Sequence, residues 1–403
     1  MTATPDRYPI RTAMQKFLPE YRKKQILSPQ QAKAASCIAQ CKTGKLGYNA
    51  EECTNPKCDF GPQIHAVSCN NRNCPCCQVP QEKKWVLSRN SELIEGIAYY
   101  HAVFTVPAQL YGLICANQKA LYTLMFRCVS QTLLELCQDK RYLGAKPGIV
   151  AVLHTHGQKL NYHPHIHTML SGGGLTKDGR FIEASHKGYL LPKAAMGRLF
   201  RGKFLDALQQ LHEDGGLVLS GENGMFRNSY EWKSFINSLY ETEWIPHINE
   251  TFNGNGNALQ YLGRYVFRTA ISNSRIESVD DSGVTFRYKD YKDGSKQKVM
   301  HMSGDDFLHA FLMHVLPKGF CRVRFYGFLA NSCRKANLLL IHKLRNTVYK
   351  GDPARDLPQP ELLKMIYHRD FNLCPKCRSP TILHRCNAGM IPYGLRPAYL
   401  IDL

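Results

Sequence analysis

The chain of 403 residues is poor in acidic side chains, and it contains no motif of a nucleotide-driven motor. Aspartate and glutamate number 32 against 52 lysines and arginines, which gives a formal net charge of +20. A protein this basic most often binds a polyanion, usually nucleic acid. The pattern GxxxxGK[ST], which would hold the phosphates of a nucleotide, does not occur.

The sequence also lacks long uninterrupted apolar stretches. No such stretch follows the first charged residues, so we expect no signal peptide. The longest candidate, residues 109–136, is broken at 117–119 and at Arg127, which is typical of an amphipathic helix rather than a membrane span. We therefore expect a cytoplasmic protein without a membrane partner. In that reducing compartment its 16 cysteines are more often metal ligands than disulfides.

Half of the cysteines lie between residues 37 and 80, after a basic segment, 1–36, that is predicted to be helical. Cys53 and Cys58 form a C-x4-C pair, and Cys74 and Cys77 a C-x2-C pair, which is the spacing of tetrahedral zinc sites. Eight cysteines and His65 could fill one site or two, and free buried thiols are the alternative. Zinc bound only by sulfur is structural and supplies folding energy. The favoured zinc ligands are Cys41, Cys53, Cys58, Cys69, Cys74 and Cys77.

A second, sparser group of ligand-type residues lies near the end of the sequence. The segment 374–386 reads CPKCRSPTILHRC. Cys374, Cys377, His384 and Cys386 could form another zinc knuckle. The alternative is a surface loop that carries spare thiols.

Histidines alternate with other residues in NYHPHIHTML, residues 161–170. In a strand, side chains two positions apart share a face, so His165 and His167 would stand side by side. Two neutral imidazoles on one face can hold one divalent metal ion. The alternative is a strand with exposed or hydrogen-bonded histidines. The segment 148–157 predicts a neighbouring strand that could complete a hairpin, and SGGGL, 171–175, is expected to be a flexible exit.

Tyr261 and Tyr265 are four residues apart in a predicted helix, 257–271, and share one face of it. Arg264 and Arg268 form a separate stripe. A tyrosine hydroxyl can attack a phosphodiester, a divalent cation can polarise it, and arginines can offset its charge. The alternative is two tyrosines half-buried at the edge of a core. Acidic pairs fall in predicted turns or at a helix start, which argues against a nuclease based on carboxylates.

Four segments in this order resemble the two-tyrosine HUH rolling-circle transposases of the insertion-sequence-91 type: 68–78, 154–175, 261–275 and 314–329. The resemblance implies an α+β fold, in which an HUH-endonuclease antiparallel sheet with packed helices follows a small Cys-rich zinc-binding domain. We expect a helical N-terminal segment at 1–36, a zinc-binding domain at 37–80, and the HUH nuclease domain at 81–275 with a helical insertion at about 176–255. A basic C-terminal region at 276–403 follows.

By this resemblance, His165 and His167 take the metal positions and Tyr261 and Tyr265 the nucleophile positions. Mg²⁺ or Mn²⁺ is the implied catalytic ion, with Zn²⁺ in a structural role. Such nucleases usually have a third metal ligand, for which His154, His156, Gln158 and His163 are candidates and His154 is favoured. The zinc block departs from the family pattern, because Asn73 stands where a histidine is usual and Cys76 lies inside the knuckle.

The implied reaction nicks and rejoins single-stranded DNA at element ends, through a 5′-phosphotyrosine, for insertion at a target site. A host helicase and replication machinery would supply the strand, because the chain has no motor motif. Residues 307–351 include no acidic residue, and basic groups there are expected to track phosphates while Phe325, Tyr326 and Phe328 stack on bases. The expected DNA-binding residues are Arg264, Arg268, Arg322, Arg324 and Lys335.

Three alternatives stay open from the sequence. The basic stretch could be a solvated face over ordinary core aromatics. Within enzymes, an HUH replication initiator or a conjugative relaxase shares the histidine strand and the tyrosine chemistry. A zinc-dependent DNA-binding protein without catalysis would require the histidine pair and both tyrosines to be incidental.

Overall fold

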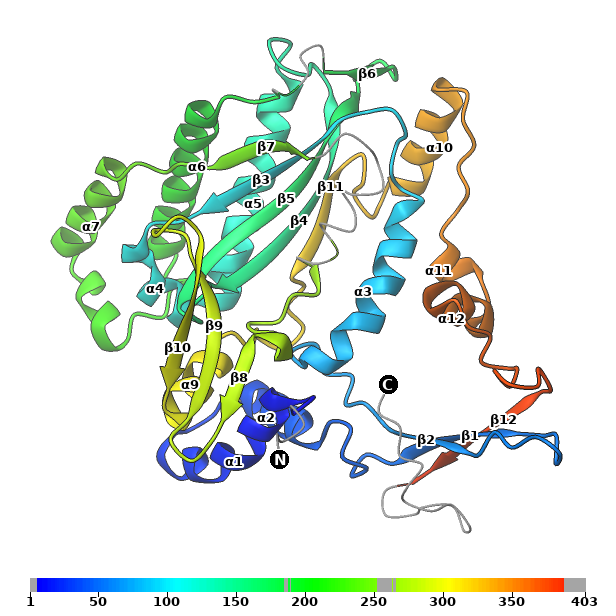
Figure 1. The fold of residues 1–403 in the computed structure, drawn as a ribbon. Coiled ribbons are helices and arrows are strands. Elements are labelled where there is room, and N and C mark those ends of the chain that lie inside the picture. The colour runs from blue at the N-terminus through cyan, green and yellow to red at the C-terminus, as the bar shows by residue number, and fades with distance from the viewer. Residues whose placement is uncertain (1–5, 185–187, 189, 252–262, 264–265, 388–403) are drawn as a thin grey trace.

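A computed structural model describes residues 6–184, 188, 190–251, 263 and 266–387 of the chain (Figure 1). Its centre is a six-stranded sheet with the order β11-β4-β5-β3-β7, and β6 pairs with β5. All neighbouring strands are antiparallel. The strands are β3 (Tyr99–Thr105), β4 (Lys146–His156), β5 (Tyr162–Leu175), β6 (Phe181–Glu183), β7 (His247–Thr251) and β11 (Val323–Gly327).

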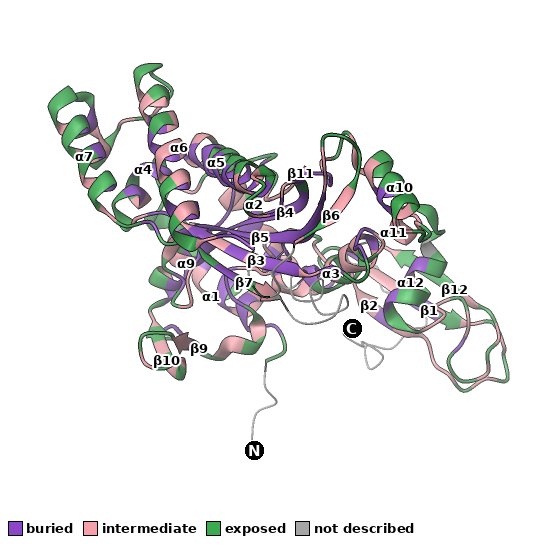
Figure 2. Ribbon diagram, turned by 90° about the horizontal axis from the view of Figure 1, so that it is seen from above, coloured by how far each residue is buried: buried purple, intermediate pink, exposed green. Residues whose placement is uncertain are grey.

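Both faces of this sheet are covered, as the purple strands between helices in Figure 2 show. On one face, Ile149, Ala151 and Leu153 of β4 pack in a cluster with α5 (Gln118–Gln138) and α6 (Lys193–Glu213). On the other face, Val150 and Val152 pack with residues of α10 (Arg334–Leu344) and against α3 (Pro75–Asn90). Because successive strand residues point to opposite faces, a strand covered twice is apolar throughout, as β4 is.

The predicted hairpin is confirmed, because β4 and β5 pair from Lys146 and Leu175 to His156 and Tyr162. Pro164 lies within β5, opposite a register shift between His154 and His156 and just before the first residue of β5 that pairs with β3. A bulge at the end of the pairing is where a sheet tolerates a proline that cannot donate a hydrogen bond.

The prediction that SGGGL is a flexible exit is wrong, because this segment belongs to β5 and pairs with β6. The glycines permit close approach there. A Cβ on Gly172 would lie 2.9 Å from the carbonyl oxygen of Ala98, and one on Gly174 would lie 2.7 Å from that of Lys146.

The predicted N-terminal helices are confirmed as α1 (Pro9–Lys24) and α2 (Pro29–Gln40). The α2 helix begins with a capping box in which Ser28 and Gln31 satisfy each other's backbone N–H groups. Both helices share a second core with α9 (Gly304–Leu312) and with a sheet of order β10-β9-β8. That sheet consists of β8 (Ile276–Val279), β9 (Val284–Asp290) and β10 (Lys296–Met302), of which β9 and β10 form an antiparallel hairpin.

A third, small sheet joins segments from the two ends of the sequence. Its order is β12-β1-β2, with β1 (Tyr48–Cys53), β2 (Gln63–Ala66) and β12 (Thr381–Cys386). The other helices are α4 (Tyr111–Ala116), α7 (Ser229–Glu241), α11 (Pro353–Asp356) and α12 (Gln359–Tyr367), with short 3-10 turns at Ala108–Leu110, Gly221–Arg227 and Asn273–Arg275. The fold is therefore mixed α+β with antiparallel sheets, as expected. Among the described residues, no helix is long and apolar enough to cross a membrane.

Candidate metal centres and the tyrosine segment

Three histidines meet on the face of the central sheet that α3 and α10 cover. His154 on β4 is directly opposite His165 on β5, and His167 follows two residues later on the same face. One ring nitrogen from each lies within 4.8 Å of those of the other two. The Nε2 atoms of His165 and His167 are 3.0 Å apart. Two nitrogens at about 2.1 Å from one ion, at right angles, would be about 3 Å apart, so the spacing fits a shared metal ion.

The hydrogen bonds of the two strand histidines leave their Nε2 atoms for a ligand. The Nδ1–H of His165 donates to the carbonyl oxygen of His163 over 2.6 Å, because a carbonyl can only accept. On the neighbouring strand β3, the Nε2 of His101 lies 2.9 Å from Nδ1 of His167. When Nε2 of His167 faces a cation, its Nδ1–H donates to His101. The sequence reasoning missed His101, although it lies in YYHAVFTVP, residues 99–107, whose composition is typical of a strand.

Burial keeps these imidazoles neutral. The pKa of His165 is lowered to about 4, chiefly because burial disfavours the charged ring. The pKa of His167 falls well below its usual value for the same reason, with further lowering by neighbouring His154, His165 and the charge of Arg268. A neutral imidazole offers the lone pair that a metal ion requires.

A pocket beside the three histidines is lined by basic, polar and apolar groups. His154 and His156 line it together with Arg268, Arg322 and Arg72, and none of its lining residues is acidic. Arg72 donates to the carbonyl oxygens of Phe320, Leu316 and Pro317, so it also fixes the loop before β11. Burial lowers the pKa of Arg322 to about 10, and its guanidinium donates to Oε1 of Gln78. This pocket suits an anion that approaches the triad.

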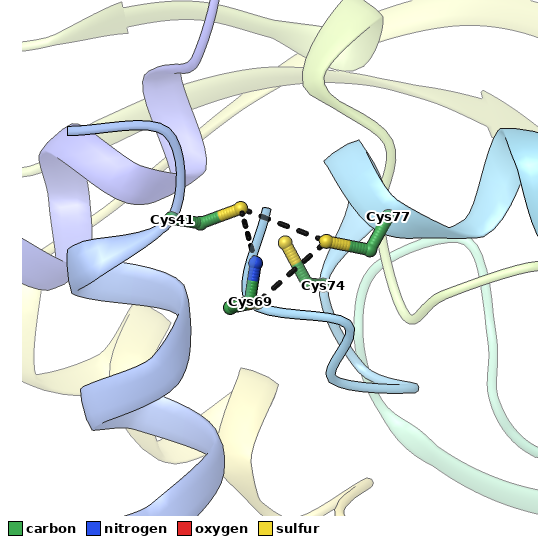
Figure 3. Close-up of side chains that lie close together, drawn as sticks. All are labelled: Cys41, Cys69, Cys74 and Cys77. Atoms are coloured by element: carbon green, nitrogen blue, oxygen red, sulfur yellow. Dashed lines mark hydrogen bonds between the residues drawn. The ribbon is translucent and has the colours of Figure 1, made fainter. Parts of the chain in front are cut away.

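Four of the predicted zinc ligands form one cluster between α2, the loop that follows β2, and the first turn of α3 (Figure 3). Cys41, Cys69, Cys74 and Cys77 have their sulfurs within 4.8 Å of one another. Sγ of Cys77 is 3.6 Å from those of Cys41 and Cys69. Tetrahedral zinc with Zn–S bonds of about 2.3 Å places sulfurs about 3.8 Å apart, so the four thiols fit this ion. Cys76 lies outside the group, and its sulfur accepts from Nδ2 of Asn273.

The remaining two predicted zinc ligands belong to a second cluster. Cys53 and Cys58 meet Cys374 and Cys377, with Sγ distances of 3.4 Å from Cys53 to Cys377 and 3.9 Å from Cys58 to Cys374. These separations again match a tetrahedral ion and exceed the S–S length of a disulfide, about 2 Å. The predicted separate knuckle at 374–386 is therefore wrong. His384 pairs with Glu52 instead, and Cys386 stands opposite Tyr48 in the sheet.

Comparisons with known proteins agree with this geometry. A family described as a transposase zinc-binding domain matches residues 13–106, and one described as a putative transposase matches residues 148–336. A putative transposase, y4qJ, of Sinorhizobium fredii is 36% identical over 353 residues, which are 87% of this chain and 88% of that protein. The transposase for insertion sequence element IS801 of Pseudomonas savastanoi is 26% identical over 88% of this chain and 83% of that protein. No solved structure matches.

The chain belongs to the IS91 family of transposases. Each matched region includes one of the candidate metal sites. The zinc-binding domain includes the first cysteine cluster, and the second region begins within the hairpin that carries the three histidines.

In this IS91-family transposase, the predicted nucleophiles Tyr261 and Tyr265, and with them Arg264, lie outside the described residues. Their described neighbours pack against α3. A Cβ on Gly263 would lie 2.4 Å from Cγ2 of Val86, and the ring of Phe267 meets Trp85 edge-on at 6.1 Å. Val266 is buried in the cluster that contains Val152 and Met169, each two residues from a triad histidine. The described part of the tyrosine segment, Gly263 and residues 266–267, therefore lies over the histidine face of the sheet.

The predicted DNA-binding residues of the transposase have different surroundings. Arg268 and Arg322 line the histidine pocket. Arg324 donates to Thr123 and lies 4.5 Å from the ring centre of Phe126, and Lys335 is exposed on α10. The prediction that Phe328 stacks on bases is wrong, because that ring is buried in the core under α10. The ring of Phe325 is already covered by Arg89 and Arg334, at 5.2 and 4.7 Å.

Proposed function

We propose that this transposase cleaves single-stranded DNA at element ends and joins it to a target through a 5′-phosphotyrosine intermediate. His154, His165 and His167 would hold the catalytic divalent ion, Mg²⁺ or Mn²⁺, and Tyr261 and Tyr265 would be the nucleophiles. The observation that carries the proposal is the convergence of three buried histidines on one sheet face, next to a core that includes Val266, the residue after Tyr265.

The chemistry divides between this chain's residues and the bound ion. The ion would polarise a non-bridging oxygen of the scissile phosphate. The tyrosine oxygen attacks the phosphorus, a bond forms between them, and the bond to the 3′ oxygen of the preceding nucleotide breaks. The phenol loses its proton, the departing strand gains a 3′-OH, and no nucleotide is consumed because the phosphotyrosine keeps the bond energy.

The basic pocket supports binding of the reacting strand. Arg268 lies close enough to lower the pKa of His156, His165 and His167 by its charge, so it belongs to the same electrostatic environment as the triad. A phosphate there would be attracted by Arg268 and Arg322, since no carboxylate among the lining residues competes.

Two tyrosines four residues apart would allow two strands to be held at once. One tyrosine would keep the first 5′ end while the other cleaves a second site, and the free 3′-OH would then attack the first phosphotyrosine. Such an exchange would require no release of the intermediate.

The test uses purified full-length protein, Mn²⁺ and a labelled single-stranded oligonucleotide that carries an element end. A covalent adduct that survives denaturing electrophoresis is expected for wild type. It should disappear in Tyr261→Phe/Tyr265→Phe and in His165→Ala. The matched controls are Tyr230→Phe, whose ring is 76% exposed on α7, and His301→Ala on β10, which should form adduct at the wild-type rate. Adduct that persists in the double tyrosine variant would refute the proposal.

A further inference from the structure

The C-terminal arm, residues 353–387, has a position in the fold that neither family match explains. The matched regions end at residue 106 and at residue 336, so the arm lies beyond both. It contains α11, α12 and β12, and it returns the chain to the N-terminal zinc-binding region (Figure 1).

The arm docks there through backbone pairing and thiols. β12 pairs antiparallel with β1 over six residue pairs, from Tyr48–Cys386 to Cys53–Thr381. The N–H and the hydroxyl of Thr54 both donate to the carbonyl oxygen of Pro380, at 3.1 and 2.8 Å. Cys374 and Cys377 then complete the second cysteine cluster with Cys53 and Cys58.

This small sheet has little apolar core to stabilise it. None of its strand residues belongs to the hydrophobic clusters found among the described residues, and Ile382 and Leu383 of β12 are 50% and 68% exposed. Its buried Glu51 is neutralised by Arg369 at 2.7 Å. Small modules of this kind usually need a metal ion to fold, and four converging thiols at tetrahedral spacing provide the ligands.

Along its path the arm follows α3. Asp352, directly before the arm, accepts from Ser88 and pairs with Arg89 near the end of α3. Further on, the ring of Tyr367 at the end of α12 lies 5.0 Å from Nζ of Lys83 in the middle of that helix. The first turn of α3 carries Cys77 of the first zinc cluster.

Described residues next to the two tyrosines also pack against α3. Val86 and Trp85 of α3 contact Gly263 and Phe267. A helix held at its start by one cluster and along its length by the arm offers a fixed surface for that segment.

We propose that the C-terminal arm completes a second, composite zinc site with Cys53 and Cys58, and that this site braces α3 as the support of the tyrosine segment. The first half concerns metal binding alone. The second half rests on the proposed function, because it assigns the arm a positioning role in tyrosine attack.

Zinc content tests the composite site directly. Purified wild-type protein should contain two zinc ions per chain by elemental mass spectrometry, and Cys374→Ser/Cys377→Ser should contain one. Cys386→Ser is the matched control, because Cys386 lies on the same arm but outside the cluster, and it should keep both ions. Two ions in the double variant, or one in the control, would overturn the composite site.

A second measurement covers the case in which the double variant does not fold. Native wild-type protein is treated with a thiol-alkylating reagent during stepwise addition of a chelator, and the modified cysteines are identified by mass spectrometry. Cys53, Cys58, Cys374 and Cys377 should become reactive in one step, separate from Cys41, Cys69, Cys74 and Cys77. Release of Cys374 and Cys377 without Cys53 and Cys58 would overturn the proposal.

The brace is tested by single-turnover adduct formation with the double variant and Cys386→Ser. Misplacement of a reacting group by about 1 Å can cost up to about a hundredfold in rate, so a fall of about tenfold or more is expected, with unchanged affinity for the oligonucleotide. An unchanged rate with one zinc lost would refute the brace and leave the composite site intact. Absence of adduct in wild type would refute the proposed function, while the zinc count would still decide the site.

Discussion

Removing the imidazole of His101 is expected to weaken metal binding at the three histidines, although His101 itself would not contact the ion. In the metal-binding arrangement, Nδ1–H of His167 donates to Nε2 of His101 over 2.9 Å, and the two rings stack at 5.1 Å. In His101→Ala this buried N–H loses its acceptor. His101→Gln keeps a side-chain carbonyl at a similar reach and should retain most of the affinity.

The magnitude follows from burial. His167 is only 7% exposed, so water cannot replace the lost acceptor freely. An unsatisfied buried donor costs about 1–3 kcal/mol, which corresponds to a loss of about 5- to 150-fold in affinity. Outer hydrogen-bond partners of metal-binding histidines typically contribute 10- to 100-fold, which is the same range.

The assay is calorimetric titration of Mn²⁺ into zinc-loaded protein, with His301→Ala as the control for loss of an exposed imidazole. Circular dichroism and urea unfolding verify that each variant is folded. Wild-type affinity in His101→Ala would refute the orienting role. Equal losses in the Ala and Gln variants would show that ring packing, and not the hydrogen bond, supports His167.

Three further outcomes are expected. Burial lowers the pKa of His314 from 6.5 to about 4, so as the pH falls the unfolded chain takes up a proton on this ring before the folded chain does. The free energy of unfolding should therefore fall between pH 6.5 and pH 4. In urea unfolding, His314→Gln should reduce this fall by up to about 3 kcal/mol. An alanine in a left-handed backbone conformation costs about 1–2 kcal/mol of stability. Gly327→Ala should cost clearly more, because the new Cβ would overlap the carbonyl oxygen of Pro147. Gly319→Ala has a similar φ but open space around the Cβ, so it should show only the backbone cost. Arg268→Gln should weaken binding of single-stranded DNA and lower the slope of log affinity against log salt by about 0.7; an unchanged slope would place Arg268 away from phosphate.

The histidine strand could be predicted because its evidence is local. Alternation of His163, His165 and His167 has the period of a strand, and the strongly apolar segment before it supplies the partner. The third ligand depends on register, and both His154 and His156 lie on the correct face of β4. The structure selects His154 because a register shift after it, and a turn in which Leu160 has a φ of +60°, place it opposite His165. A bulge of this kind leaves no trace in an alternating pattern.

The cysteine clusters could be predicted only in part, because the evidence that joins them is not local in the sequence. Short spacings identified Cys53/Cys58 and Cys374/Cys377 as ligand pairs, but a metal site joins pairs through space. These two pairs are 316–324 residues apart along the chain, and only the docking of β12 on β1 brings them together. The number of basic residues in 307–351 could not distinguish Arg322 from Arg324. The structure distinguishes them, because Arg322 lines the pocket beside the histidines and burial lowers its pKa to about 10.

The charges around the triad bear on how metal ion and DNA would depend on each other. Its three histidines bring no negative charge, and Arg268 and Arg322 line the pocket that contains His154 without a carboxylate beside them. A divalent cation there would meet uncompensated positive charge, so its affinity in the free protein would be lower than the ligand set alone suggests. A phosphodiester would supply the missing negative charge, and by linkage each of the two would favour binding of the other. On the proposed function, the site would assemble fully only on its substrate, so the free protein would hold little catalytic metal and would rarely cleave DNA elsewhere.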